Sequence, residues 1–342
     1  AWEIRKSPVF SFFLKNVYQY GESRMGSAIV IFQQMMVLFG MMLVGFFCYK
    51  WDWIDDHSYG KLSKIVVNIL NPLLVIDGVL GKSRDGSFHN LLTNLVMVIL
   101  YFVFLIIISI PVVKTIRPEK ENVGVYRLMM IFSNVGFMGI PVISALYGSD
   151  VIIYIVFYML GYNFLLYTYG IILARSSAKP AYAENHNSKG SFKENLKAII
   201  NPGTIAGIIA IILFVCKIQV AAPMTSFIQY LSQCVVPFSM ILIGASMAQQ
   251  ELKTIFKDVR MYWFLLIRLI LIPVIMALCV RNLPLDPQIL GVFILMLAMP
   301  VGSIVVLVAM EQGADSACCT RGSVISTLLS IITIPVIALL LP

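Results

Sequence analysis

Ten apolar runs, each about as long as a bilayer is thick, dominate this sequence. A helix needs about 20 mostly apolar residues to cross the hydrocarbon core of a membrane. Charged or turn-forming residues bound each run, and the alternating strands of a membrane barrel do not occur. We therefore predict an all-α membrane protein with ten transmembrane helices. The runs cover roughly residues 28–49, 62–81, 91–113, 123–147, 151–174, 199–216, 224–248, 261–280, 288–310 and 321–341.

The composition excludes a soluble enzyme and a disordered chain. Apolar residues make up 59% of the chain and charged residues 12%, with a mean hydropathy of +0.89. A soluble domain needs about a quarter of charged residues to cover its surface. The net charge of +8 indicates orientation in a lipid bilayer rather than a nucleic-acid partner, because basic residues in short loops mostly fix orientation.

The distribution of Lys and Arg predicts the orientation. With ten spans, both termini lie on one side of the membrane. That side carries eight Lys and Arg residues, and the other side carries sixteen. Cytoplasmic loops hold the excess of positive charge. We expect a multi-pass protein of the cell membrane (inner or plasma membrane) with both termini outside.

The longest hydrophilic stretch, residues 175–198, is predicted to be a cytoplasmic linker. It separates five runs in residues 28–174 from five runs in residues 199–342. Because five is odd, the second half enters the membrane upside down, which is the inverted repeat common in secondary transporters. Residues 1–27 are expected to form an N-terminal arm. Met25 stands just before the first run, so an upstream extension over residues 1–24 is an open alternative.

The fourth run of each half contains glycine and proline near its middle. One reads SNVGFMGIP over residues 133–141, and the other reads AMPVGS over residues 298–303. Proline removes a backbone donor and clashes with the preceding turn, and glycine tolerates unusual dihedrals. We predict a helix break in each run. Asn71-Pro72 in the second run and Pro237 in the seventh also correspond.

A broken backbone at this depth leaves polar groups that hydrocarbon cannot satisfy, so it is buried in protein or lines a watery cavity. Half-helix N-termini present free amides and a partial positive charge, which suit an anionic group. Ordinary proline kinks are the alternative, but breaks at matching positions of two halves favour a substrate site. The predicted substrate-binding residues are Asn134, Gly136, Gly139, Pro141, Pro300, Gly302 and Ser303, with Gln233 and Ser239 beside Pro237.

Two charged residues stand inside apolar runs, where a charge is costly and suggests function. Asp77 is a candidate for carrying a coupling proton or pairing with a cation, and the alternative is that it reaches the interface. Arg268 is a candidate for holding a substrate carboxylate. Its alternative is snorkelling to the cytoplasmic headgroups.

Several strings resemble the auxin efflux carrier family. Residues 134–141 (NVGFMGIP), followed by Tyr147-Gly148, are similar to its fourth helix. Residues 299–305 (MPVGSIV) and 309–315 (AMEQGAD) resemble its ninth helix, and residues 326–330 (STLLS) before Pro335 resemble its last helix. Further similar strings are Asn71-Pro72, Asn201-Pro202 and Pro237 with Gly244-Ala245-Ser246. The likeness covers about residues 28–342.

The resemblance implies two inverted five-helix repeats whose fourth and ninth helices cross where they unwind. It also implies a homodimer, with helices 1, 2, 6 and 7 as a scaffold and the remaining helices as a moving transport domain. Members of the family carry organic anions such as auxin or dicarboxylates. The short linker of this chain is similar to that of compact bacterial members. Asn134 matches a family asparagine at the crossover.

These observations predict a permease for small organic anions that works by alternating access. No G-x-x-x-x-G-K-S/T loop is present, and the three His residues lie in hydrophilic connections, so neither ATP binding nor an enzyme is predicted. No cysteine or histidine spacing indicates a metal, and no cofactor is expected. A channel or membrane sensor with a ligand at the same breaks is the remaining alternative.

Overall fold

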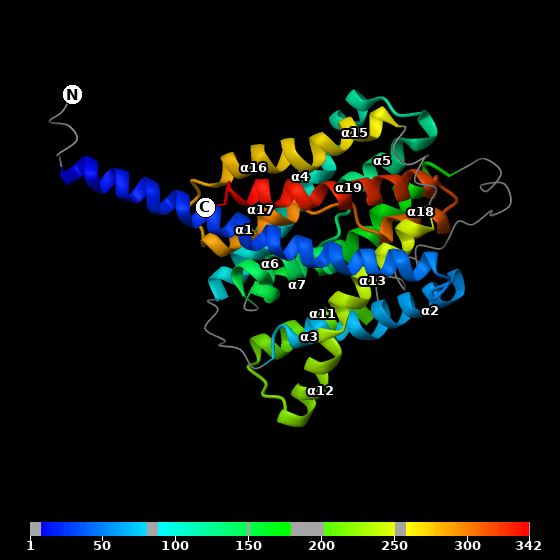
Figure 1. Ribbon diagram of the computed structural model, residues 1–342, viewed down its shortest axis with the longest axis horizontal. Helices are drawn as coiled ribbons and strands as arrows, with labels where there is room; N and C mark the ends of the chain where they lie inside the picture. Colours follow the sequence, from blue (N-terminus) through cyan, green and yellow to red (C-terminus); the bar gives the residue numbers. More distant parts are fainter. Residues whose placement is uncertain (1–7, 81–87, 149–150, 179–201, 250–257, 342) are drawn as a thin grey trace.

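The structure is a computed structural model that describes residues 8–80, 88–148, 151–178, 202–249 and 258–341 (Figure 1). The described residues form helices, with one isolated antiparallel bridge. Most of the predicted linker lies outside the described residues. The helices are α1 (Pro8–Lys50), α2 (Asp56–Ile65), η2 (Val66–Leu70), α3 (Asn71–Asp77), α4 (Phe88–Ile116), η3 (Lys120–Asn122), α5 (Val123–Ile131), η4 (Val135–Gly139), α6 (Ile140–Tyr147), α7 (Ile152–Leu165), η6 (Leu166–Gly170), α8 (Ile171–Arg175), α11 (Pro202–Val215), α12 (Ala222–Gln233), α13 (Val235–Ala248), α15 (Val259–Leu266), η7 (Ile267–Leu271), α16 (Ile272–Val280), α17 (Pro287–Ala298), α18 (Ile304–Glu311) and α19 (Ser316–Ala338).

Seven helical stretches in the described part are long and apolar enough to cross a membrane. This finding confirms the all-α membrane class. Three shorter apolar helices accompany them, and ten transmembrane helices remain a prediction. The seven stretches are Ile29–Lys50, Asp56–Asp77, His89–Ile116, Ile152–Arg175, Ala222–Ala248, Val259–Val280 and Ser316–Ala338, and the shorter helices are Val135–Tyr147, Pro202–Val215 and Pro287–Ala298.

Several helices begin earlier than their apolar runs. α2 begins at Asp56 because the Asp55 carboxylate accepts the N–H of Ser58 at 2.8 Å. α19 begins at Ser316, where the Asp315 carboxylate accepts the N–H of Cys318 at 3.0 Å. Such caps satisfy amides that the first helical turn leaves free. α1 also extends back to residue 8, so the helical backbone continues through most of the predicted arm.

Wide, π-helical turns accommodate three prolines inside membrane helices. η2, η4 and η7 directly precede Pro72, Pro141 and Pro273, each of which is the second residue of the next helix. An inserted residue opens the ladder where proline has no N–H and its ring would clash. The helices therefore bend at these prolines instead of ending there.

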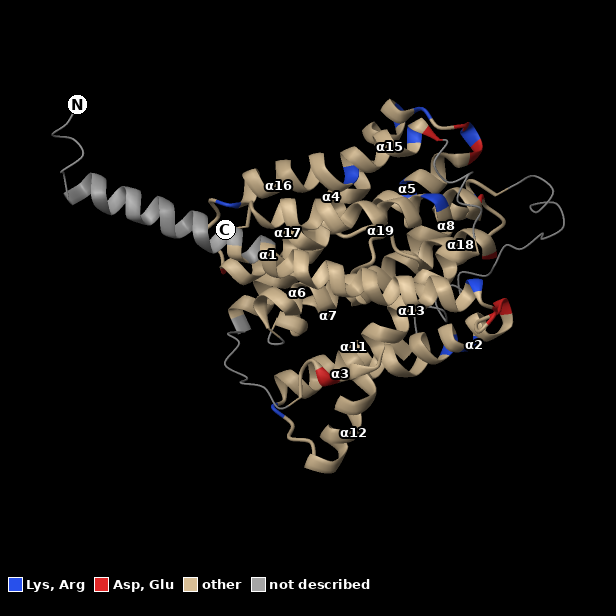
Figure 2. Cartoon of the chain, viewed as in Figure 1, with Lys and Arg blue, Asp and Glu red and all other residues tan. Residues whose placement is uncertain are grey.

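The helices run roughly along the long axis of the molecule (Figure 1). α3, α11 and α12 pack together at one side, and α4, α15 and α16 lie at the other. Charged residues gather at the end where α5 and α15 begin and where α8 and α18 end (Figure 2). The opposite end holds the C-terminal end of α19. The intervening layer is almost entirely uncharged, as expected of a bilayer-spanning bundle.

α1 and α13 approach so closely that only glycine fits at their contact. A Cβ on Gly45 would collide with the carbonyl of Ile241, and a Cβ on Gly244 would collide with the carbonyl of Met42. Small residues allow such close backbone packing between membrane helices. These two glycines therefore allow α1 and α13 to pack in direct backbone contact.

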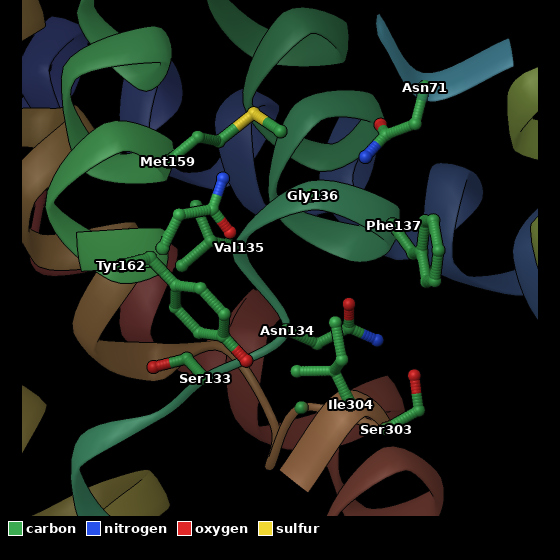
Figure 3. Close-up of a pocket in the computed structure, with 12 residues that line it drawn as sticks. Asn71, Ser133, Asn134, Val135, Gly136, Phe137, Met159, Tyr162, Ser303 and Ile304 are labelled. Carbon is green, nitrogen blue, oxygen red and sulfur yellow. The ribbon is translucent and has the colours of Figure 1, made fainter. Parts of the chain in front are cut away.

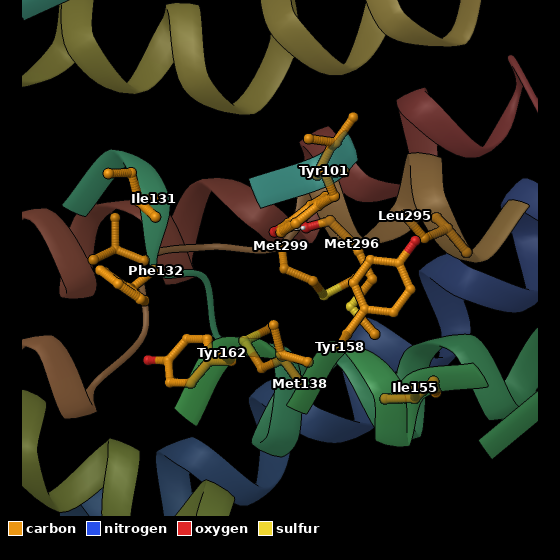
Figure 4. Packing of buried hydrophobic residues seen from close by; sticks show 14 of the residues in the cluster. Tyr101, Ile131, Phe132, Met138, Ile155, Tyr158, Tyr162, Leu295, Met296 and Met299 are labelled. Carbon is orange, nitrogen blue, oxygen red and sulfur yellow. Dashed lines mark hydrogen bonds between the residues drawn. The ribbon is translucent and has the colours of Figure 1, made fainter. Parts of the chain in front are cut away.

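The centre of the bundle is a layer of aromatic and methionine side chains (Figure 4). The ring of Tyr101 on α4 packs edge-on against Tyr158 on α7 at 5.3 Å and Phe293 on α17 at 6.2 Å. The Tyr101 hydroxyl donates to the carbonyl of Met296 at 3.3 Å and shares a hydrogen bond of 2.8 Å with the Ser133 hydroxyl. This layer supports the interrupted helices described next.

Candidate functional site

Two helices are interrupted in the middle of the bundle, and their interruptions lie side by side. The N–H of Asn134 donates to the carbonyl of Pro300 at 2.8 Å, and the N–H of Gly302 donates to the carbonyl of Phe132 at 3.0 Å. Between these bonds, the isolated antiparallel bridge joins the two segments. Each segment thus supplies partners that the other has lost by leaving the helix. We call residues 132–134 and 299–303 the crossing.

Helix α19 supplies partners for the backbone of Val301 in the second segment. The N–H of Val301 donates to the Ser326 hydroxyl at 3.0 Å, and the Ser323 hydroxyl donates to the carbonyl of Val301 at 3.3 Å. A buried backbone group without a partner costs free energy. Defined hydrogen bonds therefore hold the crossing in one conformation, unlike a helix that has merely frayed.

Gly302 is required by the closeness of the two segments. A Cβ at this position would lie 2.9 Å from the carbonyl oxygen of Ser133 and 2.9 Å from the Tyr162 hydroxyl oxygen. A Cβ on Gly136, by contrast, would meet no neighbouring atom nearer than 3.8 Å. These two of the three glycines in the predicted site thus differ in how much space surrounds them.

Arg268 lies behind the crossing, with 2% of its surface exposed. Its guanidinium donates to the carbonyl of Met129 at 3.0 Å, the carbonyl of Met299 at 2.7 Å and the Ser133 hydroxyl at 3.0 Å. This burial contradicts the alternative in which Arg268 snorkels to the headgroups. The side chain is turned into the bundle, where backbone carbonyls replace water. The guanidinium meets both segments of the crossing.

A small cavity of about 70 Å³ borders the crossing (Figure 3). The side chains of Asn134, Asn71 and Ser303 carry amide and hydroxyl groups toward this space. A cavity of roughly 10–15 Å³ is enough to hold one water molecule, so this cavity has room for several waters or for a group of similar size in this conformation. Its lining residues are Asn71, Ser133, Asn134, Val135, Gly136, Phe137, Met159, Tyr162, Asn163, Gly302, Ser303 and Ile304.

A larger cavity of about 290 Å³ leads from the charge-rich end of the molecule to the crossing. Tyr59 and Gln249 line its part near that end. Phe137, Ser303 and Ile304 line its inner part and also border the small cavity. Eight Ser and Thr residues in all line it, and none of its lining residues is charged. The volume is close to the lower bound of ordinary ligand pockets.

The small cavity lies at the N-terminal ends of two half-helices. Asn134 precedes the helix η4–α6, and Ser303 precedes α18. Asn and Ser at this position normally accept an N–H of the first turn, yet neither side chain makes that capping bond. The first N–H groups of a helix have no acceptor within it. The N–H of Val135 is already taken by the carbonyl of Ser133, and those of Val305 and Val306 by carbonyls just before α18. Among the described residues, the site therefore offers two uncommitted polar side chains and the remaining amides of the two first turns.

The structure brings together only some of the predicted site residues. Four line the small cavity, and Ser239 lines the larger one with its buried hydroxyl unpartnered among the described residues. The N–H of Gly139 donates to the carbonyl of Asn134 at 3.1 Å. The carbonyl of Pro300 accepts the N–H of Asn134. Pro141 is the second residue of α6. The four residues in the small cavity are Asn134, Gly136, Gly302 and Ser303.

Two other predicted residues lie apart from both cavities. Gln233 is exposed at the end of α12. The chain turns at Cys234, so that Ser239 faces the bundle and Gln233 does not. Asp77 accepts a hydrogen bond of 2.6 Å from the Ser232 hydroxyl on α12. Its carboxylate therefore joins α3 to α12, and it borders neither cavity.

Sequence reasoning missed several lining residues. Asn71 was recognised only as part of a helix break, yet its amide faces the small cavity and its side-chain oxygen is buried without a partner among the described residues. A polar residue beside a proline in an apolar run was the available signal. Tyr162 and Met159 carry no such signal, because aromatic and methionine residues are common throughout the core.

Comparison with known proteins identifies the family. A relative from Methanothermobacter thermautotrophicus, called an uncharacterized transporter, is 23% identical over 300 residues, covering 80% of this chain and 95% of the relative. An uncharacterized transporter of Methanocaldococcus jannaschii is 25% identical over 223 residues, covering 64% of this chain and 69% of the relative. The sequence model of the family described as membrane transport protein matches residues 30–338. The resemblance to the auxin efflux carriers is thereby confirmed, and the chain belongs to this family of membrane transport proteins.

Proposed function

We propose that this protein is a secondary transporter that binds small organic anions at the crossing and exposes them alternately to the two sides of the membrane. The observation that carries the proposal is the pair Asn134 and Ser303. Each stands at the start of a half-helix, neither caps it, and both line one cavity. Two helix N-termini, each with a partial positive charge, form a suitable setting for a carboxylate.

The lining of the two cavities supports an anion as the guest. The residues are amides, hydroxyls and apolar groups, without a carboxylate that would repel it. A buried guanidinium lies behind the crossing, and the acceptors that the structure gives it are neutral. Its positive charge is thus uncompensated by any of these partners, and it favours a negative charge nearby.

The described helices also support ten membrane crossings. The three shorter apolar helices include the half-helices η4–α6 and α17, which α5 and α18 extend across the interruptions. With α11 as the third, they add three crossings to the seven long stretches. The interruptions then fall in the fourth and ninth helices, as an inverted repeat of five helices requires.

The larger cavity defines the direction of access. It reaches the crossing from the end where charged residues gather (Figure 2). Positive charge favours the cytoplasmic side, so this conformation is open to the cytoplasm. Phe137, Ser303 and Ile304, which border both cavities, form the boundary that a guest passes. Alternating access requires a second conformation that opens the crossing to the other side.

Uptake into proteoliposomes tests the proposal. A panel of mono- and dicarboxylates is offered with and without a substrate gradient and a membrane potential. We expect saturable, gradient-coupled flux of at least one carboxylate. Ohmic conductance would favour a channel, and an absence of carboxylate flux across the panel would contradict the proposal.

Asn134→Ala is the variant that tests the site. It removes an amide that lines the small cavity. We expect the ratio of maximal carboxylate uptake rate to KM to fall at least tenfold, equivalent to about 1.4 kcal/mol. Asn68→Ala is the matched control, since the Asn68 amide bonds the carbonyl of Lys64 on its own helix. Equal uptake by both variants would remove Asn134 from the site.

Cross-linking in the membrane tests the proposed homodimer in the same preparations, and a protein that stays monomeric would contradict it.

A further inference from the structure

We propose that Arg268 gives the crossing its preference for anions without touching the substrate, by neutralising the negative ends of the two interrupted helices. This inference rests on the proposed function. It assigns Arg268 as a positioning residue, in place of the direct carboxylate ligand that its position in an apolar run suggested.

The first step is where the guanidinium binds. α5 ends at Ile131 and α17 ends at Ala298. The carbonyl of Met129 belongs to the last turn of α5, and Met299 is the residue that follows α17. The last carbonyls of a helix have no partner within it. Arg268 donates to one such carbonyl from each helix, at 3.0 and 2.7 Å.

The second step concerns the balance of charge. A helix carries about half a positive charge at its N-terminus and half a negative charge at its C-terminus. At the crossing, the N-termini of η4–α6 and α18 meet the C-termini of α5 and α17. The partial positive charges of the two N-termini and the partial negative charges of the two C-termini therefore offset one another. The guanidinium neutralises the two C-termini, so the positive N-termini dominate the electrostatic field at the site.

The third step concerns why the residue is arginine. The planar guanidinium presents several N–H groups in a fixed fork. It bonds two carbonyls and the Ser133 hydroxyl at once, and the Tyr101 hydroxyl continues this chain to α4. The wide turn η7 contains Arg268, and such turns are frequent at functional sites. Lysine retains the charge but lacks this geometry.

The experiment compares an anion with its uncharged analogue. Binding of malonate and of malonamide, its neutral diamide, is measured by competition against the carboxylate transported in the uptake panel. The ratio of the two dissociation constants is the anion preference. We expect Arg268→Met to lower this preference about tenfold or more, since a unit charge near the site is removed. A loss of affinity that is equal for both ligands would overturn the inference.

Matched variants separate charge from structure. Arg127→Met removes a partly buried arginine of α5 that bonds the hydroxyls of Tyr169 and Ser109, away from both cavities, and we expect an unchanged preference. Arg268→Lys keeps the charge but loses the fork, so it should retain the anion preference within about threefold while lowering the thermal stability of the protein. A lysine variant as impaired in preference as the methionine variant would contradict us.

Two further outcomes are decisive. If Arg268→Met does not yield a monodisperse protein, Arg268→Gln, which can still donate to one carbonyl, gives the same measurement. An unchanged preference in a folded glutamine variant would overturn the inference. A wild-type protein that takes up no carboxylate would overturn the proposed function and the inference together, whereas wild-type carboxylate uptake with charge-independent losses in the variants would overturn only the inference.

Discussion

Gly302 is the residue on which the geometry of the crossing depends most sharply. A methyl group there would lie 2.9 Å from a backbone oxygen, which cannot move aside as a side-chain end can. We expect Gly302→Ala to cost about 1–3 kcal/mol through overpacking and to abolish most uptake. Gly136→Ala, whose methyl group meets nothing nearer than 3.8 Å, should retain the thermal stability of the wild type. Thermal unfolding and proteoliposome flux measure both effects. Wild-type behaviour of both alanine variants would mean that the segments are less closely paired than described.

Residue identity alone predicts only part of this site. Asn134, Gly302 and Ser303 were predictable because glycine, proline and polar residues in the middle of an apolar run disturb a helix. The role of Arg268 was not, since its partners are the backbone carbonyls of Met129 and Met299, far away in sequence. No side-chain pattern encodes an acceptor that belongs to the backbone.

At the scale of elements, the interruptions and their correspondence follow from local sequence. Pro300 lies within the second break, at residues 299–303. The first break, at residues 132–134, precedes Pro141, which lies inside the helix that follows. The wide turns η2 and η7 were not predicted, because a proline is compatible with a kink, an end or an inserted residue. Packing against neighbouring helices decides among these. Helix starts were also misplaced, since apolar runs do not include the capped, polar first turns of α2 and α19.

At the scale of the whole molecule, the uneven charge predicts orientation. Charged residues gather at one end, and the C-terminal end of α19 lies at the other (Figure 2). Because cytoplasmic segments carry the positive excess, we expect the C-terminus outside. Alkaline phosphatase fused there should be active, and a fused fluorescent protein, which folds in the cytoplasm, should stay dark. A bright fluorescent fusion with inactive phosphatase would reverse the orientation and the direction of the larger cavity.

The central claim is that a carboxylate binds between the two half-helix N-termini at the crossing. An experimental structure with the transported carboxylate at saturating concentration tests it most directly. We predict ligand density between Asn134 and Ser303, within hydrogen-bonding distance of their side chains. Density elsewhere, with the crossing filled only by side chains, would contradict the account.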